Sequence, residues 1–322
     1  MKSKKRKVLI GLTYGDPAGI GPEILLKTIK SWKYRFTPII IGNEEILLNK
    51  SLSVNHENII FSVPKNDKKR IFKKGKPDKY SGMHSYLCLK HAVDLANKRE
   101  IKALITGPVS KKHINLAGYK FYGQTDEMAR FSMVKPENVI MLFVESDLRI
   151  ALFTRHMALK NVSKSLNKNK LSNFLILLNN EIKKHFKIRK PKIVILGLNP
   201  HAGENGNFGD EEVRTINPVI KKLKISGLNV SGPLSPDAVL AKAGQNYLKN
   251  KKQPFDVYVS FYHDQALPMF KAVCGLKGVN VTLGLPFLRV SVDHGTAFDI
   301  AGKNIASNEG LISAIRFVEK TI

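Results

Sequence analysis

The sequence has few cysteines and no long apolar run, and both absences narrow the kind of protein it encodes. Cys88 and Cys274 are the only cysteines among 322 residues and form no CxxC pair, so a disulfide framework is not expected. No uninterrupted apolar stretch approaches the roughly 20 residues of a membrane-crossing helix. The apolar run near the N-terminus is broken by Gly11 and ended by Asp16, which makes it too short for a signal peptide. We therefore expect a cytoplasmic protein with no membrane partner.

Acidic residues are also scarce. The 26 acidic residues are outnumbered by 53 lysines and arginines, which gives a net charge of +27. Such a charge is compatible with a nucleic-acid-binding protein. The lysines are scattered along the chain, however, with no interleaved aromatic residues and no recognisable nucleic-acid motif. We interpret them as a solvated surface that attracts phosphorylated ligands and nucleotides, and we expect no nucleic-acid partner.

The composition that remains is typical of a globular protein, with 43% hydrophobic and 25% charged residues. The length predicts about two domains, and short apolar runs that alternate with amphipathic segments predict a layered α/β fold. We place the first subdomain at residues 1–122 plus 303–322 and the second at residues 123–302. Strands are expected at residues 8–12, 38–41, 58–63, 103–105, 139–144, 149–153, 192–196 and 257–261. Helices are expected at residues 24–32, 81–99, 211–226 and 309–320, with a further long helix ending near residue 187.

A glycine-rich segment follows the first expected strand. It reads YGDPAGIGPE from Tyr14 to Glu23 and precedes an amphipathic helix. The glycine spacing does not match a dinucleotide-binding fingerprint, and Pro17 and Pro22 stiffen the loop. Its glycines would let the backbone approach a ligand, and the helix N-terminus favours an anion. The alternative is a tight turn that binds nothing.

Polar groups are densest between Phe261 and Ala301, where they are set among short apolar runs. Buried polar groups cost free energy unless they are paired or bind a ligand, so this segment predicts one wall of a site for a small, anionic, metal-bound substrate. Lys271, Asn280 and Arg289 follow one another along it. Lysine supplies a point charge, and arginine supplies a two-pronged fork for a carboxylate or phosphate.

Three histidines each lie within a few residues of the end of an expected strand: His156, His201 and His263. Side chains at strand ends converge at one rim of a sheet, and neutral imidazole is the commonest protein ligand of zinc. A single histidine is more often a packing residue, but the shared setting predicts a catalytic metal site with open positions for substrate. Asp264, beside the third histidine, is a candidate for orienting it.

Several motifs resemble those of the 4-hydroxythreonine-4-phosphate dehydrogenase family of vitamin B6 synthesis. They are GDPAGIGPE (15–23), TGPVSK (106–111), LNPHAGE (198–204), YHDQALPMFK (262–271) and GVNVTLGLPFLRVSVDHGTAFDIAG (278–302). The likeness runs from near residue 8 to the C-terminal helix. It implies a fold like that of isocitrate and isopropylmalate dehydrogenases, with two α/β subdomains and the active site in the cleft between them. It also implies a homodimer in which the partner chain completes each site.

The resemblance assigns roles position by position. The family's metal histidines fall on His156, His201 and His263, and its substrate-binding lysine, asparagine and arginine fall on Lys271, Asn280 and Arg289. The family's substrate-contacting GHTE pattern is GQTD here, so Thr125 is retained while Gln124 replaces the histidine. Glutamine donates and accepts hydrogen bonds but takes up no proton, so no acid-base role is expected at position 124. Asp264 and Lys271 are the catalytic candidates.

The implied reaction is the NAD- or NADP-dependent oxidation of 4-phosphooxy-L-threonine to 2-amino-3-oxo-4-(phosphooxy)butanoate. That product loses carbon dioxide to give 3-amino-2-oxopropyl phosphate in pyridoxal 5'-phosphate biosynthesis. A divalent metal, either zinc, magnesium or cobalt, would bind the substrate alcohol and lower its pKa.

Three alternatives are compatible with the residues. The first is a related dehydrogenase of another phosphorylated four-carbon hydroxy acid, such as 4-phospho-D-erythronate or D-threonate, or of a dihydrodiol dicarboxylate. The second is a metal-dependent hydrolase, because three histidines also activate water. The third is a basic nucleic-acid-binding protein without catalysis.

Overall fold

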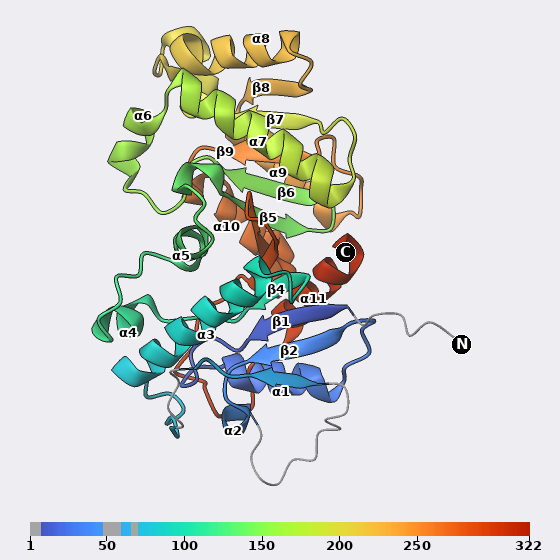
Figure 1. Cartoon of the computed structure of the whole chain (residues 1–322). Helices are drawn as coiled ribbons and strands as arrows, with labels where there is room; N and C mark the ends of the chain where they lie inside the picture. The colour runs from blue at the N-terminus through green and yellow to red at the C-terminus, as the bar shows by residue number, and fades with distance from the viewer. Residues whose placement is uncertain (1–7, 48–58, 66–69) are drawn as a thin grey trace. The chain divides into compact units, whose positions relative to one another are not determined.

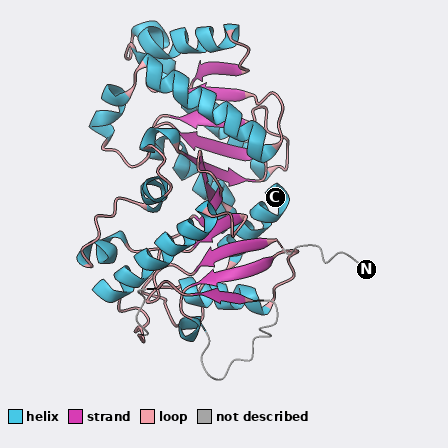
Figure 2. Ribbon diagram, viewed as in Figure 1, coloured by secondary structure: helices cyan, strands magenta, loops and turns pink. Residues whose placement is uncertain are grey.

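The computed structural model describes residues 8–47, 59–65 and 70–322. They form two compact units, one comprising Met1–Pro136 with Leu285–Ile322 and the other Glu137–Gly284 (Figure 1). Figure 2 shows the strands of each unit flanked by helices, so the expected α/β class is confirmed. None of the described helices is long and apolar enough to cross a bilayer.

The first unit is built on five parallel strands in the order β3-β2-β1-β4-β11. Buried parallel strands read as continuous apolar runs, and β2, with the sequence TPIII, is buried at every position. Helix α3 packs against β1, β2 and β4, whereas α11 packs against β11 and β4. The strands are β1 Leu9–Thr13, β2 Thr37–Ile41, β3 Ile60–Ser62, β4 Ala103–Thr106 and β11 Leu288–Val292. The helices are α1 Gly21–Lys30, α2 Glu44–Leu47, α3 Lys79–Asn97, α4 Lys111–Leu116, α5 Gln124–Phe131 and α11 Glu309–Thr321.

The second unit has the strand order β10-β5-β6-β9-β7-β8. β5 runs antiparallel to both β10 and β6, and the remaining pairs are parallel. The strands are β5 Ile140–Glu145, β6 Leu148–Leu152, β7 Ile193–Leu196, β8 Val230–Leu234, β9 Val257–Ser260 and β10 Val279–Leu283. The α-helices are α6 Val162–Ser165, α7 Lys168–Phe186, α8 Asn217–Ile225, α9 Pro236–Leu248 and α10 His263–Cys274.

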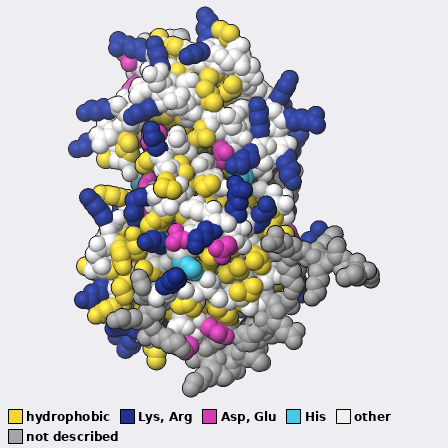
Figure 3. All heavy atoms as spheres, viewed as in Figure 1, with side chains coloured by type: hydrophobic (Ala, Val, Ile, Leu, Met, Phe, Trp, Pro, Cys, Tyr) yellow, Lys and Arg dark blue, Asp and Glu magenta, His cyan; other side chains and the backbone are white. Residues whose placement is uncertain are grey.

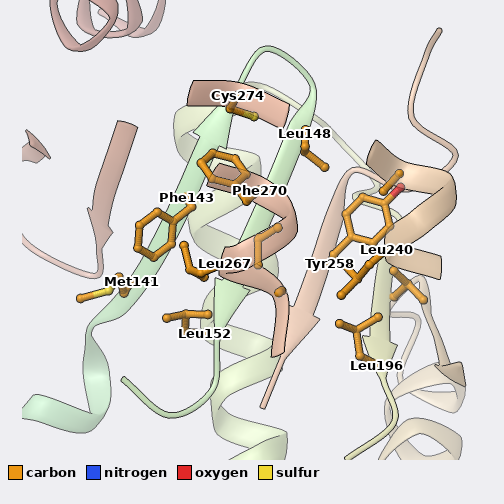
Figure 4. Close-up of a cluster of buried hydrophobic side chains, with 14 residues drawn as sticks. Met141, Phe143, Leu148, Leu152, Leu196, Leu240, Tyr258, Leu267, Phe270 and Cys274 are labelled. Atoms are coloured by element: carbon orange, nitrogen blue, oxygen red, sulfur yellow. The ribbon is translucent and has the colours of Figure 1, made fainter. Parts of the chain in front are cut away.

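One side of the second unit's core is formed by α10 packing over β5 and β6. Figure 4 shows Phe143, Leu267 and Phe270 pointing toward one another, and the two phenylalanine rings are 5.9 Å apart, edge to face. Burying a side chain of this size stabilises the fold by about 1.5 to 3 kcal/mol. This packing fixes the position of α10, whose first residue is His263.

Most expected elements occur within two or three residues of their expected bounds, but three differences matter. The sequence analysis placed no helix between residues 261 and 274, where the structure has α10. Pro268 lies inside that helix, and a proline in the sequence argues against a helix. The buried residues Ala266, Phe270 and Cys274 nevertheless recur at the helical spacing of four. Of the larger elements, β8, β10, β11 and α9 were also not expected. The single helix expected over residues 211–226 is a π-helical segment, Glu212–Ile216, followed by α8. Position 58 of the third expected strand lies outside the described residues.

The division of the chain also differs from the sequence-based subdomains. The units meet in the chain between Pro136 and Glu137 and between Gly284 and Leu285. Gln124, Thr125 and Arg289 therefore belong to the first unit, whereas the sequence-based bounds put them in the second. The predicted histidines all lie in the second unit.

Lysine and arginine side chains are dispersed over the molecular face drawn in Figure 3, where hydrophobic and uncharged surface separates them. On this face the basic residues form no single stripe. A dispersed positive field attracts phosphorylated ligands without specifying where they bind.

The glycines of the loop between β1 and α1 are required by packing within the first unit. A Cβ on Gly15 would lie 2.0 Å from the carbonyl oxygen of Pro108, and one on Gly21 would lie 1.7 Å from that of Tyr14. A Cβ on Gly19 would lie 2.7 Å from the carbonyl oxygen of Thr296. These contacts account for the three glycines without a ligand.

We expect Gly15→Ala to lower the free energy of unfolding by about 2 to 4 kcal/mol, because it adds a backbone clash to a left-handed conformation with φ of +79°. Gly118→Ala is the matched control, since φ is +89° there and nothing lies within 4 Å of the added carbon. It should cost only about 1 to 2 kcal/mol. Urea unfolding of both variants measures the difference, and equal losses would show that the Pro108 contact is unimportant.

Candidate active site

His156 and His263 are brought together by two neighbouring strands. β6 and β9 pair in parallel through Leu152 and Ser260, and beyond them the Thr154 amide donates to the Phe261 carbonyl at 3.1 Å. The two chains therefore leave the sheet side by side. The histidine ring centroids lie 5.8 Å apart with their planes tilted by 38°.

This separation fits two ligands of one metal ion. With Zn–N bonds of about 2.1 Å, two imidazoles on a tetrahedral ion have ring centroids roughly 5 Å apart. His156 is exposed and His263 is 36% exposed, so an ion could reach both from solvent. The donor set is one that zinc, cobalt and related ions accept.

Asp264 contacts His263 directly. Its Oδ1 lies 2.7 Å from Nδ1 of the imidazole, and its side chain is 81% exposed. When Nδ1 donates to this carboxylate, Nε2 is the nitrogen available as a metal ligand. The contact is compatible with the orienting role that the sequence analysis predicts for Asp264, and that role stays a prediction.

His201 is the third predicted ligand. Its ring packs 6.2 Å from that of Phe208, on a turn of left-handed backbone between Pro200 and Gly206. Within the described ranges, no group of three or more His, Cys, Asp and Glu side chains is arranged to hold a metal ion. The structure thus pairs two of the three predicted ligands.

A hydrogen bond from Ser235 lowers the pKa of the nearby Asp237, and the charge of His201 acts in the same direction.

Arg289 is the largest fully buried side chain of the described residues, at 2% exposure. It projects from β11, and its Nη2 donates to Thr106 Oγ1 at 2.8 Å and to Gln124 Oε1 at 2.9 Å. Burial lowers its pKa to about 9. A bound anion would favour the charged guanidinium and offset this burial, so the site is suited to a phosphate or carboxylate.

Gln124 uses both ends of its amide within the protein. Its Oε1 accepts from Arg289, and its Nε2 donates to the Gly107 carbonyl at 3.1 Å. Gln124 is the first residue of α5, and the neighbouring Thr125 is buried. The sequence analysis did not identify Thr106 as a partner of the arginine, although it lies in the TGPVSK motif.

Asn280 and Lys271 occupy different environments in the second unit. Asn280 is buried in β10, and its Oδ1 has no hydrogen-bond partner among the described residues. An unsatisfied buried acceptor is costly, which suits a position where a ligand donates. Lys271 is exposed in the last turn of α10.

Asp16 is a buried carboxyl group that sequence reasoning did not single out. It accepts from the Ala18 amide at 3.0 Å and from Ser81 Oγ at 3.4 Å. Burial raises its pKa above the ordinary 3.8, although these hydrogen bonds oppose the change. Lys74 lies beside the same loop and donates to the Pro17 carbonyl at 3.1 Å, and burial lowers its pKa.

The raised pKa of Asp16 predicts a pH-dependent stability difference. The folded state holds the proton more tightly than the unfolded chain, so ionisation of Asp16 costs stability as pH rises from the ordinary 3.8 through the raised value. Asp16→Asn removes this cost. The unfolding free energy of the variant should therefore increase relative to that of the wild type as the pH rises above about 4. Parallel urea titrations test this, and a gap that narrows with pH would contradict it.

Comparisons with known proteins agree over nearly the whole chain. A family model described as "Pyridoxal phosphate biosynthetic protein PdxA" matches residues 34–318. A 4-hydroxythreonine-4-phosphate dehydrogenase from Sulfurihydrogenibium sp. (strain YO3AOP1) is 40% identical over 323 residues, covering 96% of this chain and 96% of the relative. One from Aquifex aeolicus (strain VF5) is 37% identical and covers 96% of this chain and 97% of the relative.

Solved structures show the same likeness. The crystal structure of 4-hydroxythreonine-4-phosphate dehydrogenase from Klebsiella pneumoniae matches with a TM-score of 0.80 at 28% identity, covering 98% of this chain and 99% of that one. A β-decarboxylating dehydrogenase from Thermococcus kodakarensis matches in fold, with a TM-score of 0.51 at 14% identity, covering 97% of this chain and 82% of that one. The expected fold type is therefore confirmed.

Proposed function

The chain belongs to the PdxA family of pyridoxal phosphate biosynthetic proteins, and from this premise we propose that it oxidises 4-phosphooxy-L-threonine with NAD or NADP. The product is 2-amino-3-oxo-4-(phosphooxy)butanoate. Its ketone is β to the carboxylate, so it loses carbon dioxide readily and gives 3-amino-2-oxopropyl phosphate, a precursor of pyridoxal 5'-phosphate. The near full-length match to relatives named for this activity carries the proposal.

The first unit supplies the anion-binding part of this proposal. Arg289 presents a guanidinium that Thr106 and Gln124 orient by hydrogen bonds of 2.8 and 2.9 Å. Such a fork binds phosphate or carboxylate through two parallel hydrogen bonds. Thr125, beside Gln124 on α5, is the further substrate contact that we propose.

The second unit supplies the metal ligands. We assign His156, His201 and His263 to a divalent ion, and zinc suits three imidazoles best. When bound, such an ion supplies Lewis-acid chemistry that lowers the pKa of the substrate alcohol. Asn280 Oδ1 is a buried acceptor for a substrate hydroxyl or ammonium group. We expect each set of groups to be required, so the loss of either set should abolish turnover.

Proton handling falls to the chain's own side chains. Asp264 holds Nδ1 of His263 and is exposed, so it can exchange a proton with solvent when the alcohol is oxidised. Lys271, a cation on the same helix, is the second catalytic candidate. The hydride leaves the substrate carbon for the nicotinamide ring.

We further propose a homodimer in which a second copy completes each site. Apolar side chains are exposed beside two of the histidines. Met157 and Leu159, just after His156, are 45% and 68% exposed, and Phe208, packed on His201, is 51% exposed. Exposed apolar side chains next to functional groups are typical of a surface that a partner covers. Both cysteines are buried and neither forms a disulfide in the described part of the chain, which suits the reducing cytoplasm that we propose as the location.

The deciding experiment is an assay of purified protein, stripped of metal and reloaded with zinc, magnesium or cobalt. We expect reduction of NAD or NADP only with metal and 4-phosphooxy-L-threonine, together with formation of 3-amino-2-oxopropyl phosphate. Unphosphorylated 4-hydroxythreonine, D-threonate 4-phosphate and 4-phospho-D-erythronate are the comparison substrates. Preferential turnover of one of these would reassign the substrate, and cofactor-independent phosphate release would identify a hydrolase instead.

A further inference from the structure

The turn that carries His201 has an unusual backbone. Five consecutive residues, His201 to Asn205, all have positive φ, between 42° and 77°. Gly203 adopts such angles without strain and Asn205 at a modest cost, whereas His201, Ala202 and Glu204 are strained. Side chains on a left-handed turn crowd the backbone, so a run of this kind persists only where the surroundings hold it in place.

Glu212 provides that support from outside the turn. Its carboxylate is 1% exposed. Oε1 accepts from the backbone amides of Leu198 and Asn199 at 2.7 and 2.9 Å, and Oε2 accepts from Nδ2 of Asn199 at 2.8 Å. These are the residues that lead directly into Pro200 and His201. Three of the roughly four acceptor positions of this carboxylate are therefore occupied by groups at the start of the turn.

The same carboxylate also lies against the middle of the turn. A Cβ added to Gly203 would be 2.7 Å from Oε2 of Glu212. The glycine at position 203 therefore serves two purposes, because it accepts a positive φ of 77° and leaves room for the carboxylate. Glu212 thus contacts the turn both at its start and at its centre.

We infer that Glu212 is a positioning residue for His201: it holds the strained turn in one conformation and so fixes the direction from which the imidazole would approach a metal ion. The inference rests on the proposed function for the role of the metal, but the positioning itself is a property of the chain alone. Residues that orient a metal ligand in this way typically change metal affinity 10- to 100-fold when they are altered.

The test uses two pairs of variants in the full-length protein. Glu212→Gln keeps the size of the side chain but replaces one accepting oxygen with a donor. Its control is Glu211→Gln, because Glu211 accepts from Ser163 and from Asn199 Nδ2 but from no backbone amide of the turn. Gly203→Ala pushes on the same carboxylate. Its control is Gly206→Ala, at φ of +103° with nothing within 4 Å of the added carbon.

The first measurement needs no metal. In histidine-labelled protein, the ring resonance of His201, assigned from its absence in His201→Ala, should shift or broaden in Glu212→Gln and Gly203→Ala and stay in place in both controls. The second measurement is titration with Co²⁺ followed by visible absorption. The dissociation constant should rise about 10- to 100-fold in the first pair and less than about threefold in the controls.

The outcomes separate the inference from the proposed function. An unmoved His201 resonance in both Glu212→Gln and Gly203→Ala overturns the positioning role, as does lower thermal stability with an unchanged Co²⁺ affinity. If the resonance moves but the wild type binds no Co²⁺, the positioning role stands and the proposed metal chemistry fails. Agreement between two chemically unrelated variants excludes an effect peculiar to one substitution.

Discussion

His263→Ala should lower kcat/KM by about 10³-fold or more and abolish tight binding of a divalent metal. His263 shares the 5.8 Å ring pair with His156 and is oriented by Asp264 at 2.7 Å. Removal of the ring therefore takes away a ligand and releases its orienting carboxylate. The measurement is steady-state kinetics with 4-phosphooxy-L-threonine, together with metal content after dialysis.

Two further variants serve as comparisons for the activity loss expected in His263→Ala. Asp264→Asn keeps the ligand and alters only the group that orients it, so a smaller loss of about 10- to 100-fold is expected. His91→Ala is the matched control, because His91 bonds to Ser62 Oγ at 2.7 Å in the first unit. Wild-type turnover by metal-replete His263→Ala would exclude the proposed metal chemistry.

Arg289→Met should raise KM for the phosphorylated substrate at least about 100-fold while leaving the protein as stable as the wild type, or more stable. The guanidinium is buried, and burial lowers its pKa to about 9. A buried charge can often be replaced by an apolar side chain of similar size without loss of stability. The charge is therefore expected to serve binding rather than folding. The KM of Arg289→Lys should lie between those of the wild type and Arg289→Met, because lysine keeps the charge but lacks the two-pronged guanidinium.

Arg130→Met is the contrasting control, and we expect it to lower stability without changing KM. Arg130 is 57% exposed and pairs through two nitrogens with Glu127, which is only 2% exposed. The variant leaves a buried carboxylate without this partner, so unfolding should become easier by about 1 to 3 kcal/mol. Its KM should be unchanged. A large loss of stability in Arg289→Met with normal KM would contradict our assignment of the two arginines.

Several features of the site could be predicted from local sequence. The three histidines were identified because each follows an apolar strand, and two of the strands concerned, β6 and β9, are indeed neighbours. Asp264 was identified because it adjoins His263. Both arguments use positions a few residues apart, where chain connectivity alone limits the distance between side chains. The helix α10 was missed because Pro268 interrupts a pattern that is otherwise regular.

The hydrogen-bond partners of Arg289 could not be predicted from residues close to it in the sequence. Gln124 is 165 positions away along the chain and Thr106 is 183. A glutamine in place of the family histidine indicates only that no proton is taken up there. That its two ends are both used, by Arg289 and by the Gly107 carbonyl, depends on how α5 meets the end of β4.

The sequence by itself determined the α/β class and the family, and it predicted which residue types carry the chemistry, because periodicity and motifs are properties of neighbouring residues. The tertiary structure alone decided which of those residues meet. It paired His156 with His263, gave Arg289 its buried setting, and placed the Glu212 carboxylate under a left-handed turn. The physical reason is that burial and hydrogen-bond partners arise from strand order and helix packing, which bring together residues that the chain keeps far apart.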